Sequence, residues 1–284
     1  MNPVQRTAAV ILPATLVFSV LCVFVSDLWP IAAAQTMFFL LALVFVLRTA
    51  IRGRMPEGHW IIALLAGAVL WGLLQLLLAR SVNRFETWSA ILRFGAYLSA
   101  FFVSFQVFHH PEIRRYFRMG AIYFGCLLSV EAIIQRFTSD GRIFWMLAPT
   151  ENTIRAMGPF VNPDHYCAFM ELIFPLALWQ ALTDRARTAK FVVIAAVIFA
   201  GVITGASRAG FVLIVAEIVF VLLFTRRAVV GVRRKVSLQV VAATVSLIVV
   251  FGFVVGWDVL LDRFKEPGQF EIRWQLWLDR KSVV

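Results

Sequence analysis

Residues 158–182 read GPFVNPDHYCAFMELIFPLALWQAL, and this stretch decides the fold because a short polar interruption opens directly into an apolar run. Asn162 is a favoured residue type before a helix, Pro163 suits the first helical position, and Asp164 belongs in the first turn. The run that follows is long enough to cross a bilayer as a helix. The sequence therefore predicts a membrane-spanning helix with a capped, polar N-terminus, whose Asn, Asp and His side chains either only start the helix or also line a pocket.

A second interruption, TGASRAG at residues 204–210, has the same form and opens another apolar run. Ser207 can cap the helix that follows, which places Arg208 in the first turn. A cation there opposes the helix dipole, and either an anionic ligand or a phospholipid headgroup would resolve that conflict. The spacing of Gly201 and Gly205 predicts close helix packing rather than ligand binding.

Apolar runs of this kind recur along the chain, which has 284 residues, of which 61% are hydrophobic and only 15% charged. Long uninterrupted runs indicate a membrane protein rather than a large soluble core. We therefore predict an all-α fold, a polytopic transmembrane helical bundle. Nine spans are predicted, at Ala8–Val25, Ile31–Leu47, Trp60–Leu78, Trp88–Phe108, Met119–Ile134, His165–Leu182, Lys190–Thr204, Ser207–Phe224 and Val236–Val255.

The net charge of +11 comes from short basic clusters between the apolar runs. A nucleic-acid-binding protein would gather such residues on one soluble face, so we expect no nucleic-acid partner. Most of the 27 Lys and Arg residues fall in alternate loops, and the positive-inside rule then predicts a cytoplasmic N-terminus. Both polar interruptions consequently face outward, and His165 is the outward histidine of the four. The three cysteines show no metal-binding spacing, and we expect neither a metal nor another cofactor.

Ionisable residues inside spans are costly and mark candidate sites. Arg93, Glu131 and Glu171 all fall near the outer ends of their predicted spans, where they would line a wet cavity or form a structural ion pair. Glu217 is placed deeper. The outward segment after residue 255 is amphipathic and carries Arg263 and Arg273, and it either lies on the membrane as an interfacial helix or begins a larger loop.

Three segments together resemble the O-antigen ligase and O-antigen polymerase superfamily of bacterial envelopes. Residues 158–168, followed by Pro175, are similar to the family's G-x-F-x-N-x-N-x-x-A helix opening, with Asp164 where a second Asn is common. Residues 204–210 are similar to its S-R-G/A-G segment. Arg263-Phe264 with residues 273–277 resembles the start of its large periplasmic loop, including the R-x-x-x-W element.

The resemblance implies a metal-independent glycosyltransferase of the bacterial inner membrane. Such enzymes take a glycan from undecaprenyl diphosphate on the periplasmic face and pass it to a lipid A–core sugar, a growing polysaccharide or a protein hydroxyl. About twelve spans are expected in the family. The expected domains are a transmembrane domain over residues 1–255 and a truncated periplasmic loop over residues 256–284. The family's proposed histidine base and its glycine-rich element would lie beyond Val284, so this fragment alone is expected to be inactive.

The residue chemistry and the resemblance suggest the same site. Arginine stays charged and binds phosphate through two hydrogen bonds, which suits a leaving diphosphate. We assign Arg208 and Arg273 as catalytic residues at the diphosphate. The predicted substrate-binding residues are Asn162, Asp164, His165, Ser207, Arg155, Arg263, Arg93 and Glu171.

Two other functions remain open on sequence grounds. A cell-wall glycosyltransferase of the shape, elongation and division family has a related topology but depends on a catalytic aspartate. A transporter or flippase of lipid-linked sugars would show polar residues through the full membrane depth and internal repeats. The sequence shows neither of these two features.

Overall fold

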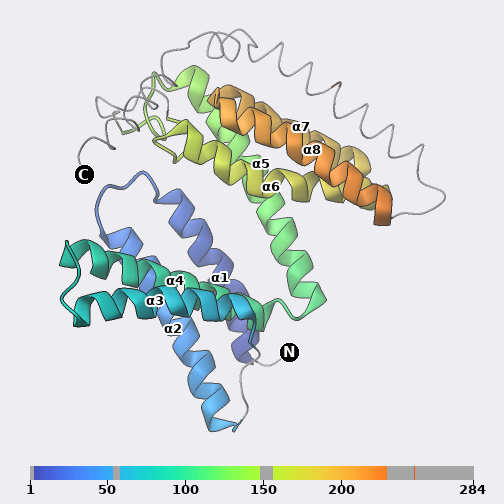
Figure 1. Ribbon diagram of the computed structural model, residues 1–284. Helices are drawn as coiled ribbons and strands as arrows, with labels where there is room; N and C mark the ends of the chain where they lie inside the picture. Colours follow the sequence, from blue (N-terminus) through green and yellow to red (C-terminus); the bar gives the residue numbers. More distant parts are fainter. Residues whose placement is uncertain (1–2, 54–57, 148–155, 229–245, 247–284) are drawn as a thin grey trace. The chain divides into compact units, whose positions relative to one another are not determined.

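The computed structural model describes residues 3–53, 58–147 and 156–228, together with Ser246 (Figure 1). The described residues form eight α-helices, one turn of 3-10 helix (Arg185–Arg187) and no strand, which confirms the predicted all-α class. The helices are α1 (Pro3–Leu21), α2 (Trp29–Ile51), α3 (Trp60–Leu77), α4 (Arg84–Val107), α5 (Pro111–Thr138), α6 (Pro163–Thr183), α7 (Thr188–Gly205) and α8 (Arg208–Ala228).

Seven of these helices, α1 to α7, are long and apolar enough to cross a membrane. The apolar part of α8, Ala209–Phe224, is shorter than a full span. These helices indicate a multi-pass membrane protein, as the sequence predicted. Apart from Ser246, the predicted ninth span, Val236–Val255, lies outside the described residues, as does the domain boundary at residues 255 and 256, so nine spans remain a prediction.

Several helices begin or end away from their predicted bounds. The predicted span Met119–Ile134 is the apolar part of α5, which starts at Pro111 and continues to Thr138. Hydropathy follows only the part of a helix that lies in hydrocarbon, whereas backbone hydrogen bonding continues through the polar turns at both ends. Likewise α4 starts at Arg84, because the Asn83 side chain accepts hydrogen bonds from Phe85 N (3.1 Å) and Glu86 N (3.2 Å).

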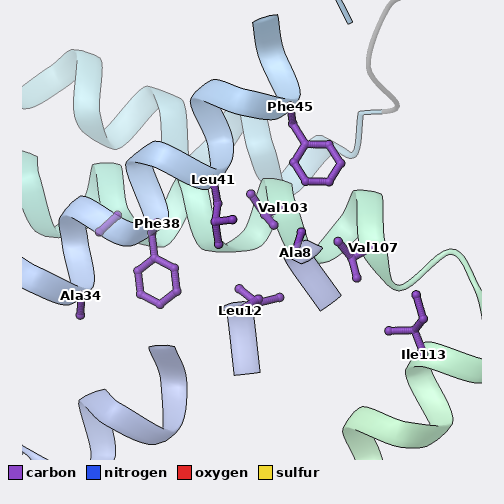
Figure 2. Close-up of a cluster of buried hydrophobic side chains, with 10 residues drawn as sticks. Ala8, Leu12, Ala34, Phe38, Leu41, Phe45, Val103, Val107 and Ile113 are labelled. Carbon is purple, nitrogen blue, oxygen red and sulfur yellow. The ribbon is translucent and has the colours of Figure 1, made fainter. Parts of the chain in front are cut away.

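The chain divides into two compact units, Met1–Arg118 and Met119–Val284, which we call unit 1 and unit 2. In unit 1, α1, α2 and α4 pack around an apolar core (Figure 2). Helix α3 packs against α4, and none of the residues of α3 is buried. The core residues are Ala8, Leu12, Ala34, Phe38, Leu41, Phe45, Ala96, Val103, Val107 and Ile113.

One end of unit 1 carries most of its basic residues. Ala8, Phe45, Val107 and Ile113 cluster together, so the start of α1, the end of α2, the end of α4 and the start of α5 share this end (Figure 2). The start of α3 joins them, because the rings of His59 and Phe105 lie 5.7 Å apart. The concentration of basic residues in alternate loops predicted that these loops lie on the same side of the helices. In unit 1 they do share one end. This basic end of unit 1 contains Arg6, Arg48, Arg52, Arg114, Arg115 and Arg118.

In unit 2, α6 packs against both α7 and α8 (Figure 1). Several of these contacts fall at glycines, where no side chain keeps the helices apart. A Cβ atom added at Gly205 would lie 2.9 Å from Cys167 Sγ, and one added at Gly210 would lie 2.8 Å from Cys167 Cβ. Gly201 lies against the Tyr166 hydroxyl. The predicted role of the Gly201 and Gly205 pair in close packing is therefore confirmed, and α7 is largely buried as a result.

We expect Gly201→Ala to lower the free energy of unfolding by about 1–3 kcal/mol, because the added methyl group overfills a close contact. The new Cβ would meet the Tyr166 hydroxyl and lie 3.1 Å from Ser129 Cβ. Gly120→Ala is the matched control within α5, since nothing lies within 4 Å of its Cβ position. That change should stabilise the helix by about 0.5–1 kcal/mol. Thermal unfolding in one detergent, followed by tryptophan fluorescence, measures both, and equal midpoints for the two variants would contradict the packing described.

Candidate functional site

The first predicted interruption forms the capped start of α6. The Asn162 side chain accepts a hydrogen bond from Asp164 N at 2.8 Å, and Pro163 occupies the first helical position. This arrangement satisfies one of the orphan backbone donors at the helix start. The side chains of Asn162, Asp164 and His165 are exposed. The predicted cap is confirmed, and the three predicted binding side chains remain accessible at this helix end.

The second interruption ends α7 and starts α8 within two residues. Ala206 adopts the left-handed conformation (φ 50°, ψ 35°), which stops α7. The Ser207 hydroxyl accepts a hydrogen bond from Gly210 N at 3.2 Å and caps α8, whose first residue is Arg208. The predicted cap is again confirmed. Ser207 itself is buried, with 6% of its surface exposed. The structure describes the backbone of Arg208 but not its side chain.

These two interruptions lie side by side in unit 2. The Cβ position of Gly205, at the end of α7, is 3.9 Å from Pro163 Cβ in the first turn of α6. Cys167, one turn into α6, has Ser207 as a hydrogen-bond neighbour. The starts of α6 and α8 are therefore adjacent, which agrees with the prediction that both interruptions face the same side. Each helix start carries a partial positive charge of about half an elementary charge, so two adjacent starts favour an anionic ligand.

Helix α5 holds the loop that leads into α6. Gln135 is fully buried, and its side chain donates to Gly158 O (3.3 Å) and accepts from Phe144 N (3.1 Å). Gly158 has φ +57°, a conformation that L side chains rarely adopt. A Cβ atom there would also lie 2.6 Å from a carboxylate oxygen of Glu131. Sequence reasoning missed Gln135, because nothing local to residue 135 signals a partner in a loop further along the chain.

A second contact from α5 fixes the first turns of α6. The Tyr166 hydroxyl donates a hydrogen bond to Ser129 Oγ at 3.2 Å, and both side chains are fully buried. Ser129 in turn lies 3.5 Å from the sulfur of Met170. A buried hydroxyl pair of this kind is costly to break, so it holds the α6 start in one position. The exposed residues Asn162, Asp164 and His165 thus stand on a rigid support.

The predicted carboxylates occupy two separate places in unit 2. Both side-chain oxygens of Glu131 are buried beside Gly158 without a hydrogen-bond partner. Glu171 lies near Gly210 and within electrostatic range of Glu217, which sequence reasoning had placed deeper. This proximity follows from sequence spacing, because each glutamate lies about two turns after the first residue of its helix. The two helices are adjacent and start at the same end. Arg93, the proposed partner of these carboxylates, is exposed on α4 and belongs to unit 1.

The remaining predicted site residues, Arg155, Arg263 and Arg273, lie outside the described residues. Within the described ranges, no group of three or more His, Cys, Asp and Glu side chains is placed to hold a metal ion. Comparisons with protein-family models, curated proteins and solved structures found no match to this chain.

We expect Gln135→Leu to destabilise the protein by about 1–3 kcal/mol, because it leaves Gly158 O and Phe144 N without the buried amide that pairs them. Arg142→Gln is the surface control, since Arg142 is exposed in the same connection, and it should change stability by less than about 0.5 kcal/mol. Unfolding midpoints in detergent compare the two. Limited proteolysis around residue 158 should also become faster in Gln135→Leu. An unchanged cleavage rate would show that the Gln135 side chain does not hold the loop.

Proposed function

We propose that this protein is a membrane glycosyltransferase that moves a glycan from undecaprenyl diphosphate to an acceptor hydroxyl on the periplasmic face of the bacterial inner membrane. The observation that carries the proposal is the adjacency of the α6 and α8 starts, beside Pro163 and Gly205. Two positive helix ends that converge within a set of apolar helices suit an anionic group attached to a lipid. A lipid-linked diphosphate combines these two properties.

The proposed site residues take different chemical roles. Arg208, the first residue of α8, supplies a permanent positive charge for the diphosphate, and Arg273 supplies a second. Arg155 and Arg263 are further cations for the same group. Asn162, Asp164 and His165 are exposed at the α6 start and suit hydrogen bonds with sugar hydroxyls. Ser207 is buried and acts through the helix cap that orients α8.

The proposed reaction needs stabilisation of one developing charge. The acceptor oxygen attacks the anomeric carbon, the bond from that carbon to the diphosphate oxygen breaks, and the electron pair leaves with undecaprenyl diphosphate. The hydroxyl proton passes to a general base. Preorganised cations and helix dipoles that face the leaving oxygen stabilise the transition state without a metal ion. The acceptor is a lipid A–core sugar or a growing surface polysaccharide.

A second candidate function is transport of a lipid-linked sugar. The observation that favours it is that a carboxylate oxygen of Glu171 on α6 lies 3.2 Å from the Cβ position of Gly210 on α8, the helix that also carries Glu217. Both glutamates lie about 12–14 Å along their helices at about 1.5 Å per residue. Ionisable groups at such a depth are typical of proton relays in transporters. A transporter moves the lipid-linked sugar across the bilayer intact, whereas a transferase releases undecaprenyl diphosphate.

We expect Arg208→Ala and Arg273→Ala to lower the rate of glycan transfer by about 10²–10³-fold each, because each removes a cation that the proposal assigns to the leaving diphosphate. Arg208→Lys should retain part of the rate, since the charge remains while the two-point hydrogen bonding is lost. The assay follows release of undecaprenyl diphosphate from a purified lipid-linked donor in proteoliposomes.

Arg187→Ala is the matched control, because Arg187 is an exposed arginine between α6 and α7, at the opposite end of these helices. It should leave the transfer rate unchanged. If Arg208→Ala and Arg273→Ala both transfer glycan at the wild-type rate, the proposal is wrong. Movement of the intact donor across the bilayer without release of diphosphate would instead support transport.

A further inference from the structure

The basic end of unit 1 has a large excess of positive charge. Its described residues include six arginines and, as the acidic residue of the α5 start, Glu112. At the opposite end of the same helices, acidic residues offset most of the positive charge. There Arg80, Arg84 and, further along α4, Arg93 are accompanied by Asp27 and Glu86, which leaves an excess of one positive charge. The asymmetry is therefore a property of one surface of unit 1 and not of the whole unit.

Two neighbouring arginines dominate this surface. Arg114 and Arg115 lie in the first turns of α5, and both side chains are exposed. Ile113, directly before them, is buried in the core of unit 1, so the turn that carries them is held in place (Figure 2). Both arginines repel Arg118 one turn further along α5, and Arg52 repels Arg48 at the end of α2. An anion bound between these guanidinium groups would reduce their mutual repulsion, so this surface attracts anions.

Aromatic side chains lie at the same end. The His59 ring is 5.6 Å from Trp60 and 5.7 Å from Phe105, and Phe105 is 5.7 Å from His109. Trp60 is also well exposed. Aromatic rings with a polar tip are enriched where a membrane protein meets the headgroup region. We call His59, Trp60, Phe105 and His109 the aromatic band, and we expect it, together with Arg114 and Arg115 at the start of α5, to lie at the depth of the lipid phosphates.

We propose that the basic end of unit 1 is a binding surface for the headgroups of anionic phospholipids, with Arg114 and Arg115 as its principal contacts. Guanidinium groups bind phosphate through paired hydrogen bonds, and an anionic headgroup adds a net charge that a zwitterionic headgroup lacks. A nucleic acid would carry the same phosphate chemistry, but it would have to reach arginines beside an aromatic band at the bilayer surface. The proposal is independent of the proposed glycosyl transfer.

The test measures which lipids the purified full chain retains from bilayers of equal phosphatidylglycerol and phosphatidylcholine content, by native mass spectrometry. Wild type should retain phosphatidylglycerol in excess over phosphatidylcholine. The double variant Arg114→Gln, Arg115→Gln should reduce that excess by about fivefold or more, since each arginine near the surface contributes to attraction of anionic lipid. The double variant Arg80→Gln, Arg84→Gln removes the same charge from the opposite end and should retain the wild-type excess.

Three outcomes would overturn the proposal: no excess of phosphatidylglycerol in wild type, an equal loss in both double variants, or displacement of the lipid by a short oligonucleotide. The wild-type measurement does not depend on the folding of any variant. Arg114→Lys with Arg115→Lys keeps the charge and should retain most of the excess, which separates lipid binding from damage to the α5 start.

Discussion

Close approach of α7 and α8 to α6 is the constraint on which the rest of unit 2 depends. Glycine at positions 201, 205 and 210 lets the backbones meet where any side chain would collide with Tyr166 or Cys167. In lipid, helices gain little from hydrophobic burial against one another, so dense packing and buried hydrogen bonds hold them together. The same approach brings the end of α7 and the starts of α6 and α8 to one place, which creates the candidate site.

The support for that site comes from α5, through a few polar contacts. Gln135 holds the loop at Gly158, and Ser129 holds the first turns of α6 through Tyr166. A buried polar group without a partner is expensive, so these contacts have one stable arrangement. Glu131 is the exception, because both of its oxygens are buried without a hydrogen bond. The exposed side chains of Asn162, Asp164 and His165 are therefore presented by a firmly held helix end.

Charge is distributed by a separate rule in each unit. In unit 1 the arginines gather at one end, beside the aromatic band, where phospholipid headgroups favour them. In unit 2, within the described residues, the electrostatic groups around α6 are the capped helix starts and the carboxylates. We propose that the first arrangement contacts the headgroups of the bilayer and that the second binds a ligand with a diphosphate group. The two surfaces can be altered separately, since they belong to different units.

The sequence by itself determined the helices, the caps at Asn162 and Ser207, and the basic loops that share one end of unit 1. These features follow from hydropathy, capping preference and charge within a few residues, so they can be predicted locally. Only the tertiary structure decided that Gln135 would hold Gly158, that Tyr166 would meet Ser129, and that α5 would continue through its arginines. The two hydrogen bonds join residues 23 and 37 positions apart, and such pairings depend on how the helices pack rather than on any local pattern.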